Sequence, residues 1–221
     1  MKKIIIAAAI TMTTGLAQAD QYNGIYGGVD YTSTKTISQT TSLGPTGSWE
    51  TVGSVLDFNK TKDNIGAHIG YQQTINGQFL IGAEAAYIPN KSTTTIVSPT
   101  VAWHNDSYST KDIYSLNARV GFVKDSWLFY AKGGVAETTL SINLVDTLFP
   151  ANYYNQSKRT LGASFGGGIE YAFMENISIG IDYNEINWKT SSAVGEQVPL
   201  NDSFRISAKS KITSLRFNYM F

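Results

Sequence analysis

The sequence predicts an all-β fold, an eight-stranded antiparallel up-and-down transmembrane β-barrel with short periplasmic turns and long extracellular loops. Three observations lead to this prediction. Polar and apolar residues alternate in segments of roughly ten residues, the length that a tilted strand needs to cross a bilayer. The links between segments are alternately short and long. Aromatic residues gather at the segment ends, where a membrane protein meets the bilayer interfaces.

In each segment, alternate residues form one apolar face, as expected of a strand with a period of two. In chain order the segments are Tyr22–Tyr31, Asn64–Gln72, Phe79–Ile88, Ile113–Val123, Trp127–Ala136, Arg159–Ala172, Ile177–Asn184 and Ile212–Phe221. The apolar faces of the first four segments include Ile25, Val29, Ile65, Ile69, Ile81, Ala85, Leu116 and Val120. Those of the last four include Phe129, Val135, Leu161, Phe165, Ile179, Ile181, Leu215 and Phe217.

The lengths of the links favour a membrane barrel over a soluble sandwich, whose strands would alternate as well. Short links (Gln73–Gln78, Lys124–Ser126, Phe173–Asn176) are followed by long ones. The long links are Thr32–Asp63, Pro89–Asp112, Glu137–Lys158 and Asn187–Lys211. Structureless loops of this length are uncommon in compact soluble domains. We therefore expect both chain ends on the periplasmic side, with the long loops outside.

The first residues have the pattern of a secretory signal peptide, with Lys2 and Lys3 before an apolar run and Ala17-Gln18-Ala19 at its end. We expect residues 1–19 to be the signal peptide and residues 20–221 to be the barrel domain. A membrane-spanning helix would need roughly 20 apolar residues, and this run is too short. Without residues 1–19 the chain has more acids than bases, which disfavours a nucleic-acid partner. There is no cysteine, so neither a disulfide nor a thiol site is expected.

Outward aromatic residues are expected to form two girdles at the membrane interfaces. The upper girdle would contain Tyr31, Tyr87, Tyr114 and Tyr183. The lower girdle would contain Tyr71, Phe79, Phe122, Trp127, Tyr171, Tyr219 and Phe221. Ordinary core aromatics would not gather at strand ends in this way.

With these features the chain resembles the small eight-stranded outer-membrane proteins of the surface-antigen and opacity type, which include the barrel of outer-membrane protein A. The resemblance rests on segments such as Tyr26–Val29, Ile65–Tyr71, Gly166–Tyr171 and Asn218–Phe221. It implies a bacterial outer-membrane location, contact with outer-membrane lipid and lipopolysaccharide, and recognition by the outer-membrane assembly machinery through the C-terminal strand. Members of the group have diverse roles, including structural proteins, adhesins and weak pores.

The inward faces carry charges that are expected at similar heights in the lumen. This predicted charge layer contains Glu84, Arg119, Lys132, Glu170, Asp182, Arg216 and His68. Positions on neighbouring strands suggest the pairs Glu84–Arg119, Lys132–Glu170 and Asp182–Arg216. An eight-stranded barrel is just wide enough for its own side chains. A packed structural core is therefore expected rather than a gated pore.

Two histidines limit the search for a catalytic site. His68 has inward phase in mid-strand, so we expect it to be packed in the lumen. His104 lies near Asp106 and Ser107 in a predicted outer loop, and neighbours in a polar loop are weak evidence for a triad. No P-loop, dinucleotide motif or metal-ligand spacing is present. The sequence predicts no catalytic residue, no cofactor and no metal.

The outer loops are the expected site of any specific contact, because they form the large exposed surface. The aromatic residues that stand out in them are Trp49, Phe58, Trp103, Phe149, Tyr153 and Tyr154. Two alternatives are open for these residues, contact with a host ligand or another cell and packing against one another. After Val135 the apolar phase slips to even numbers at Leu140 and Ile142, which predicts a β-bulge near Ala136 to Thr138. In the last loop Lys189, Arg205, Lys209 and Lys211 form a modest basic excess, suited to lipopolysaccharide phosphates.

The sequence thus predicts an integral outer-membrane barrel, with no enzymatic turnover, that has a structural role or contacts a host ligand or another cell through its loops. The first alternative is a narrow, gated channel for ions or small solutes. The second is a loop-borne hydrolase that acts on lipid A or peptides.

Overall fold

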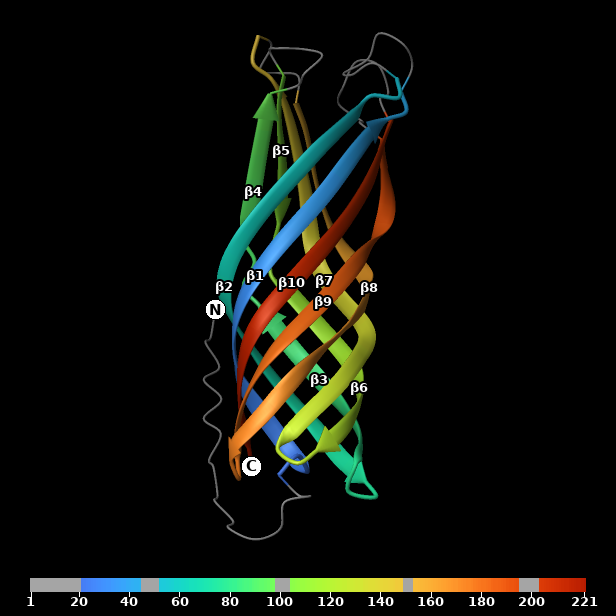
Figure 1. Ribbon diagram of the computed structural model, residues 1–221. Helices are drawn as coiled ribbons and strands as arrows, with labels where there is room; N and C mark the ends of the chain where they lie inside the picture. The colour runs from blue at the N-terminus through green and yellow to red at the C-terminus, as the bar shows by residue number, and fades with distance from the viewer. Residues whose placement is uncertain (1–20, 45–51, 98–103, 149–152, 195–202) are drawn as a thin grey trace, which may run out of the picture.

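The computed structural model describes residues 21–44, 52–97, 104–148, 153–194 and 203–221. These residues form ten strands that run up and down around a single long axis (Figure 1). The strands are β1 (Gly24–Ser42), β2 (Val55–Ile75), β3 (Phe79–Ile88), β4 (Ser92–Val97), β5 (His104–Thr110), β6 (Ile113–Lys124), β7 (Trp127–Asp146), β8 (Tyr153–Met174), β9 (Ile177–Val194) and β10 (Ser203–Met220). None of the described residues belongs to a helix long and apolar enough to cross a membrane.

Eight of the strands close into a ring in which every pair is antiparallel. The order is β1, β2, β3, β6, β7, β8, β9 and β10, and β10 returns to β1 through a ladder from Tyr26–Met220 to Ser42–Phe204. The predicted eight-stranded barrel is therefore confirmed. The remaining strands, β4 and β5, form a hairpin between β3 and β6.

The long strands continue well beyond the predicted membrane-crossing segments, so the structure corrects the expected loop bounds. β1 runs on from Tyr31 to Ser42, and β2 already begins at Val55. Threonine is enriched in these stretches and favours strands, so a Thr-rich and Ser-rich composition was compatible with pairing. Tight turns do connect the strands at the opposite end, as at Asn76–Gly77 and Asp125–Ser126.

The outer face of the lower barrel is apolar between two aromatic levels. Exposed side chains there include Ile65, Leu116, Val120 and Ile181. At the upper level the rings of Tyr87 and Tyr114 lie 5.1 Å apart. At the lower level Phe79 and Phe122 are 5.8 Å apart, Trp127 and Tyr171 are 4.8 Å apart, and Tyr219 and Phe221 are 5.1 Å apart. This band and its two aromatic levels fit the apolar girdle of an outer-membrane barrel.

Above the upper aromatic level the ring divides into two sheets of four strands each. β2 pairs with β3 only up to Ala67–Tyr87, and β8 pairs with β9 only up to Gly162–Trp188. Within the described residues, the upper parts form one sheet of β4, β5, β7 and β8 and another of β9, β10, β1 and β2. These two groups of strands diverge toward the top of Figure 1. We call this part the two-sheet unit.

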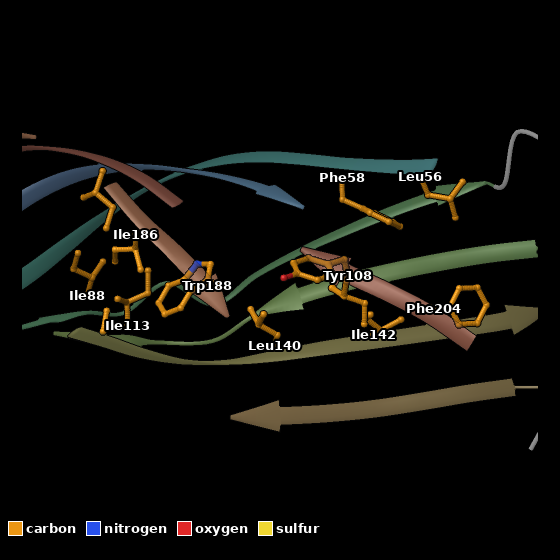
Figure 2. Close-up of a cluster of buried hydrophobic side chains, with 13 residues drawn as sticks. Leu56, Phe58, Ile88, Tyr108, Ile113, Leu140, Ile142, Ile186, Trp188 and Phe204 are labelled. Atoms are coloured by element: carbon orange, nitrogen blue, oxygen red, sulfur yellow. The ribbon is translucent and has the colours of Figure 1, made fainter. Parts of the chain in front are cut away.

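Apolar side chains fill the interior of the two-sheet unit (Figure 2). The cluster extends from Ile88, Ile113 and Ile186 at its base to Leu56 and Phe204 at its top. Phe58, one of the aromatic residues that stand out in the expected outer loops, is 4% exposed within this cluster. Burial also raises the pKa of Tyr108 to about 12. The two-sheet unit thus has a core like that of a soluble sandwich.

The predicted bulge near Ala136 is wrong. β7 pairs with β8 in unbroken register from Trp127–Tyr171 to Val145–Tyr153. The apolar phase changes because the environment changes. Below the upper aromatic level the outward Val135 faces lipid. Above that level the inward Leu140 and Ile142 face the core of the two-sheet unit. A strand that leaves a membrane for a soluble-type core reverses its apolar face without slipping.

Candidate functional site

The lower lumen contains a network of buried charged and phenolic side chains centred on Glu84. Glu84 Oε2 accepts hydrogen bonds from Arg216 Nη2 at 2.6 Å and from the Tyr26 hydroxyl at 2.9 Å. It also lies 3.4 Å from Arg119 Nη1. Arg216 comes from β10 and Arg119 from β6, so one carboxylate joins opposite walls of the barrel.

A second set of contacts completes this lumen network. Arg119 Nη2 lies 2.8 Å from Glu170 Oε1, and Lys132 Nζ lies 2.8 Å from Asp182 Oδ1. The Tyr130 hydroxyl donates to Asp182 Oδ2 at 2.7 Å. Its ring also lies under the Arg119 guanidinium, 3.9 Å from ring centroid to Cζ. Buried charges paired in this way are costly to separate, because each lost partner leaves a desolvated charge.

The structure brings together all the members of the predicted charge layer, and two of the three predicted pairs approach each other. Arg119 Nη1 lies 3.4 Å from Glu84 Oε2, and Arg216 Nη1 lies 3.7 Å from Asp182 Oδ2. The predicted pair Lys132–Glu170 is wrong, because Lys132 lies opposite Gly166 and Glu170 lies opposite Leu128. Arg119 and Lys132 are direct cross-strand neighbours. Their like charges require acids that reach them from other strands.

Sequence reasoning left three members of the network out of the layer. Asp30 lies opposite Arg216 in the β1–β10 ladder, with its Oδ1 3.3 Å from Arg216 Nε. Tyr26 and Tyr130 supply the hydroxyl groups described above. All three residues have inward phase in their strands. Their inward phase and their height along the barrel axis both follow from the sequence and could have placed them in the charge layer.

His68 is packed in the lumen beside Asp30. Its Nδ1 lies 2.8 Å from Asp30 Oδ2, and its ring centroid lies 5.9 Å from that of Tyr26. The residue is 5% exposed. A histidine enclosed in this way has no access to a substrate.

The lumen network is closed off above and below. Arg119 and Glu84 are each 1% exposed, and Arg216 is 2% exposed. Beneath them lies an apolar cluster that includes Tyr22, Leu80 and Leu128. Above them begins the core of the two-sheet unit. A water-filled passage would leave these charges hydrated, so the described conformation is a filled barrel rather than an open pore.

Asp106 and Ser107, the candidate partners of His104 in the hydrolase alternative, do not converge. Asp106 and Ser107 lie on opposite faces of β5. Asp106 is fully buried, whereas the Ser107 hydroxyl lies 2.8 Å from that of Thr95 on the outer face. The backbone of His104 pairs with Asp146 at the end of β5. Asp106 and Ser107 therefore cannot serve one catalytic centre together.

Two of the five candidate loop contacts belong to the described residues. Trp49, Trp103 and Phe149 lie outside the described residues. Tyr153 and Tyr154 begin β8, where their backbones pair with Val145 and Leu144. The basic residues Lys189, Arg205 and Lys211 are exposed, and Lys209 is partly exposed, on the outer face of β9 and β10. Lys209 Nζ lies 2.8 Å from Glu185 Oε1 just above the upper girdle. This contact lowers the pKa of Glu185.

The model of one protein family, the outer membrane protein beta-barrel domain, matches residues 5–221. No curated protein matches the chain. Among solved structures, the chain is similar to Ail, the attachment invasion locus protein of Yersinia pestis, in complex with the heparin analogue sucrose octasulfate. The identity is 14% and the TM-score 0.40, and the match covers 87% of this chain and 99% of Ail.

Two further solved structures are similar to the chain. One is the outer-membrane protease OmpT from Escherichia coli, with 10% identity, a TM-score of 0.48, and coverage of 90% of this chain and 97% of OmpT. The other is the N-terminal β-barrel domain of Pseudomonas aeruginosa OprF, with 12% identity, a TM-score of 0.35, and coverage of 82% and 96%. Identities this low carry no activity or ligand over to this chain.

Proposed function

The chain belongs to the outer-membrane protein β-barrel family, and we propose that it acts as a surface-interaction protein, without catalysis, whose two-sheet unit contacts a host ligand or another cell. The observation that carries this proposal is the length of the strands. β8 has 22 residues and β1 has 19, whereas about 9 to 11 residues suffice to cross the membrane. The surplus places the upper ends of these strands about 25 Å above the membrane, given the strand rise and tilt.

The filled lumen supports a surface role over the narrow channel. Three basic side chains are held by acids at distances of 2.6 to 2.8 Å in the shortest contacts. An ion would have to displace these contacts in order to pass. The outer end of the molecule, in contrast, offers accessible surface.

The outer face of the two-sheet unit is suited to polar contacts. Neighbouring strands present paired hydroxyl groups, such as Thr93–Ser109 at 2.9 Å and Ser141–Ser157 at 2.9 Å. β4 pairs with β5 on one side only, within the described residues. Its sequence, Ser92–Val97, contains no charge and no proline, the features that usually protect an edge strand. We propose that this edge takes up an extended segment of the partner.

Shortening the four extracellular hairpins tests the proposed function. Each hairpin would be closed with an Asn-Gly turn just above the upper girdle, with the lower barrel left unchanged. The replaced residues are 34–62, 89–112, 139–159 and 185–211. We expect the shortened barrel to fold but to lose adhesion of intact cells to host cells and to one another. Unchanged adhesion at equal surface levels would leave only a structural role.

A charge placed on the edge strand tests the binding mode. Thr93→Lys puts a lysine on β4, and Thr139→Lys puts one on the central strand β7 as a matched control. We expect the β4 variant to lose adhesion and the control to keep it, since lysine on an edge disfavours strand addition. Equal adhesion by the two variants would exclude this edge as the contact.

The exposed basic residues support a second contact, with lipopolysaccharide. Lys35 of β1 lies directly opposite Lys211 of β10, just above the upper girdle. Two cations placed opposite each other are unfavourable without an anion nearby. The acid opposite Lys211 on β9, Glu185, lies 2.8 Å from Lys209 Nζ, and Lys35 is on the far side of Lys211 from it. A further anion beside Lys35 would therefore be favourable. We propose that lipopolysaccharide phosphates supply that anion. The protein would then be purified with less lipopolysaccharide when Lys35 and Lys211 are both changed to Gln, and an unchanged amount would contradict the contact.

A further inference from the structure

The lipid-facing wall at the periplasmic end contains a hollow of about 500 Å³. Its lining residues are Lys124, Asp125, Trp127, Phe129 and Ile169. The volume is in the range of small-molecule sites. Because the hollow lies on the outside of the barrel at the lower aromatic girdle, its natural occupant comes from the membrane.

The lining is divided by polarity along the membrane normal. Phe129 and Ile169 are cross-strand partners on the lipid-facing side of β7 and β8, and each is 44% exposed. Trp127 lies one step lower, and Lys124 pairs with it across the turn. Asp125 follows Lys124 in the turn itself. An apolar wall therefore leads down to a rim with one cation, one anion and one indole.

Neighbouring segments hold the turn that carries this rim. The Gln21 side-chain amide donates to the Asp125 carbonyl at 3.0 Å. The Tyr22 hydroxyl donates to the Ser126 carbonyl at 2.8 Å, and the Ala172 amide donates to the same oxygen at 2.9 Å. Three contacts from two other segments thus fix the β6–β7 turn. A rim fixed before the ligand arrives loses little conformational freedom on binding.

We infer that this hollow, which we call the rim site, binds a periplasmic-leaflet phospholipid whose headgroup carries both a phosphate and a primary ammonium group. The charges determine this choice. Lys124 complements the phosphate, Asp125 complements the ammonium group, and the Trp127 ring offers the ammonium group a cation–π surface. An acyl chain then lies along Phe129 and Ile169. An anionic lipid has no ammonium group, so it would place its negative charge near the Asp125 carboxylate without a compensating cation.

Native mass spectrometry of the folded full barrel tests this inference, with phosphatidylethanolamine or phosphatidylglycerol added to the detergent micelle. We expect the barrel to retain phosphatidylethanolamine about tenfold better, the size of one charge-assisted contact. Lys124→Ala should lower retention of both lipids. Asp125→Asn should lower retention of phosphatidylethanolamine alone. Asn suits this position because φ is 54°, and Asn tolerates the left-handed region.

Glu175→Gln is the matched control, since it removes one exposed acid from the neighbouring periplasmic turn. Retention by this variant should equal that of the unchanged barrel. Heat-dependent gel mobility would show that each variant is folded. Equal retention of the two lipids by the unchanged barrel would overturn the inference. So would Lys124→Ala or Asp125→Asn behaving like the control. These results do not depend on cell adhesion and leave the proposed surface role to its own test.

Discussion

The lower barrel and the two-sheet unit are built largely from the same strands but have opposite distributions of polarity. Below the upper girdle, apolar residues such as Val120 face outward and charges such as Arg119 fill the interior. Above it, hydroxyl groups face outward and residues such as Phe58 and Trp188 fill the interior. The backbone register of β7 and β8 runs through both regions unchanged. The medium outside the wall therefore decides which face is apolar.

Backbone packing differs between the two regions as well. In the lower barrel a Cβ added at Gly28, Gly134 or Gly166 would lie 2.0 to 2.1 Å from a neighbouring carbonyl oxygen. A tightly coiled ring of eight strands needs such close approaches. The two-sheet unit places Phe58, Tyr108 and Trp188 at inward positions instead.

Arg216→Met should destabilise the lower barrel, and we expect it to have the largest effect of the variants proposed. It removes the shortest contact of Glu84 and the arginine beside Asp30, and so leaves these buried acids with one cation fewer. We expect the free energy of unfolding to fall by about 3 to 5 kcal/mol, measured by urea denaturation in lipid vesicles. Arg205→Met is the control, because Arg205 is exposed on the same strand. Equal effects at the two positions would show that the lumen network is not what stabilises the lower barrel.

Phe58→Ala should affect the two-sheet unit alone. The cavity left by this buried ring should lower the free energy of unfolding of the two-sheet unit by about 3 kcal/mol. The loss should appear as local opening above the membrane. Limited proteolysis of intact cells would then cleave the upper strands, while the lower barrel keeps its heat-dependent gel mobility. Loss of both regions together would mean that they unfold as one unit.

Gly166→Ala should lower the free energy of unfolding by about 1 to 3 kcal/mol. The new Cβ would lie 2.1 Å from the Tyr183 carbonyl oxygen, a backbone atom that cannot easily move. Gly133→Ala is the matched control in the same sheet, where the added Cβ would lie an ordinary 3.8 Å from the Ser164 carbonyl oxygen. The same urea experiment measures both variants. Similar costs would indicate that β8 and β9 adjust to the added methyl group.

The smallest effect is expected at Glu185, at the boundary of the two regions. The hydrogen bond from Lys209 lowers the pKa of Glu185. Its stabilising contribution is therefore present above the ordinary glutamate pKa of about 4.3 and is lost as pH falls through the lower, folded-state value. Carboxyl NMR should show this low titration midpoint. Lys209→Met should raise the midpoint toward the ordinary value, and an unshifted midpoint in the unchanged protein would contradict the contact.

The sequence predicts the lower barrel well because lipid imposes a strict period of two on each crossing segment. Leu215 and Phe217 face outward and Arg216 faces inward, as expected. Partners such as Lys132–Asp182 were not predictable from strand neighbours, because long side chains cross the lumen to acids on other strands. The two-sheet unit was missed for a different reason. A Thr-rich and Ser-rich strand such as the upper part of β1 has the composition of a loop. Its inward Thr40 lines a small cavity together with Tyr108 of β5 and Ile142 of β7, contacts that the sequence does not reveal.

Arg216 also links the chemistry of the lumen to the way the barrel assembles. It lies on β10, yet its partners Asp30 and Glu84 lie on β1 and β3. The contact with β3 forms across a ring that β10 must first close. A partly assembled sheet would expose unpaired charges on the face opposite its lipid-facing side, and hydrocarbon would not tolerate them. Such a sheet would not be stable in the bilayer. Insertion and closure should therefore be kinetically inseparable, with no long-lived open sheet in the membrane.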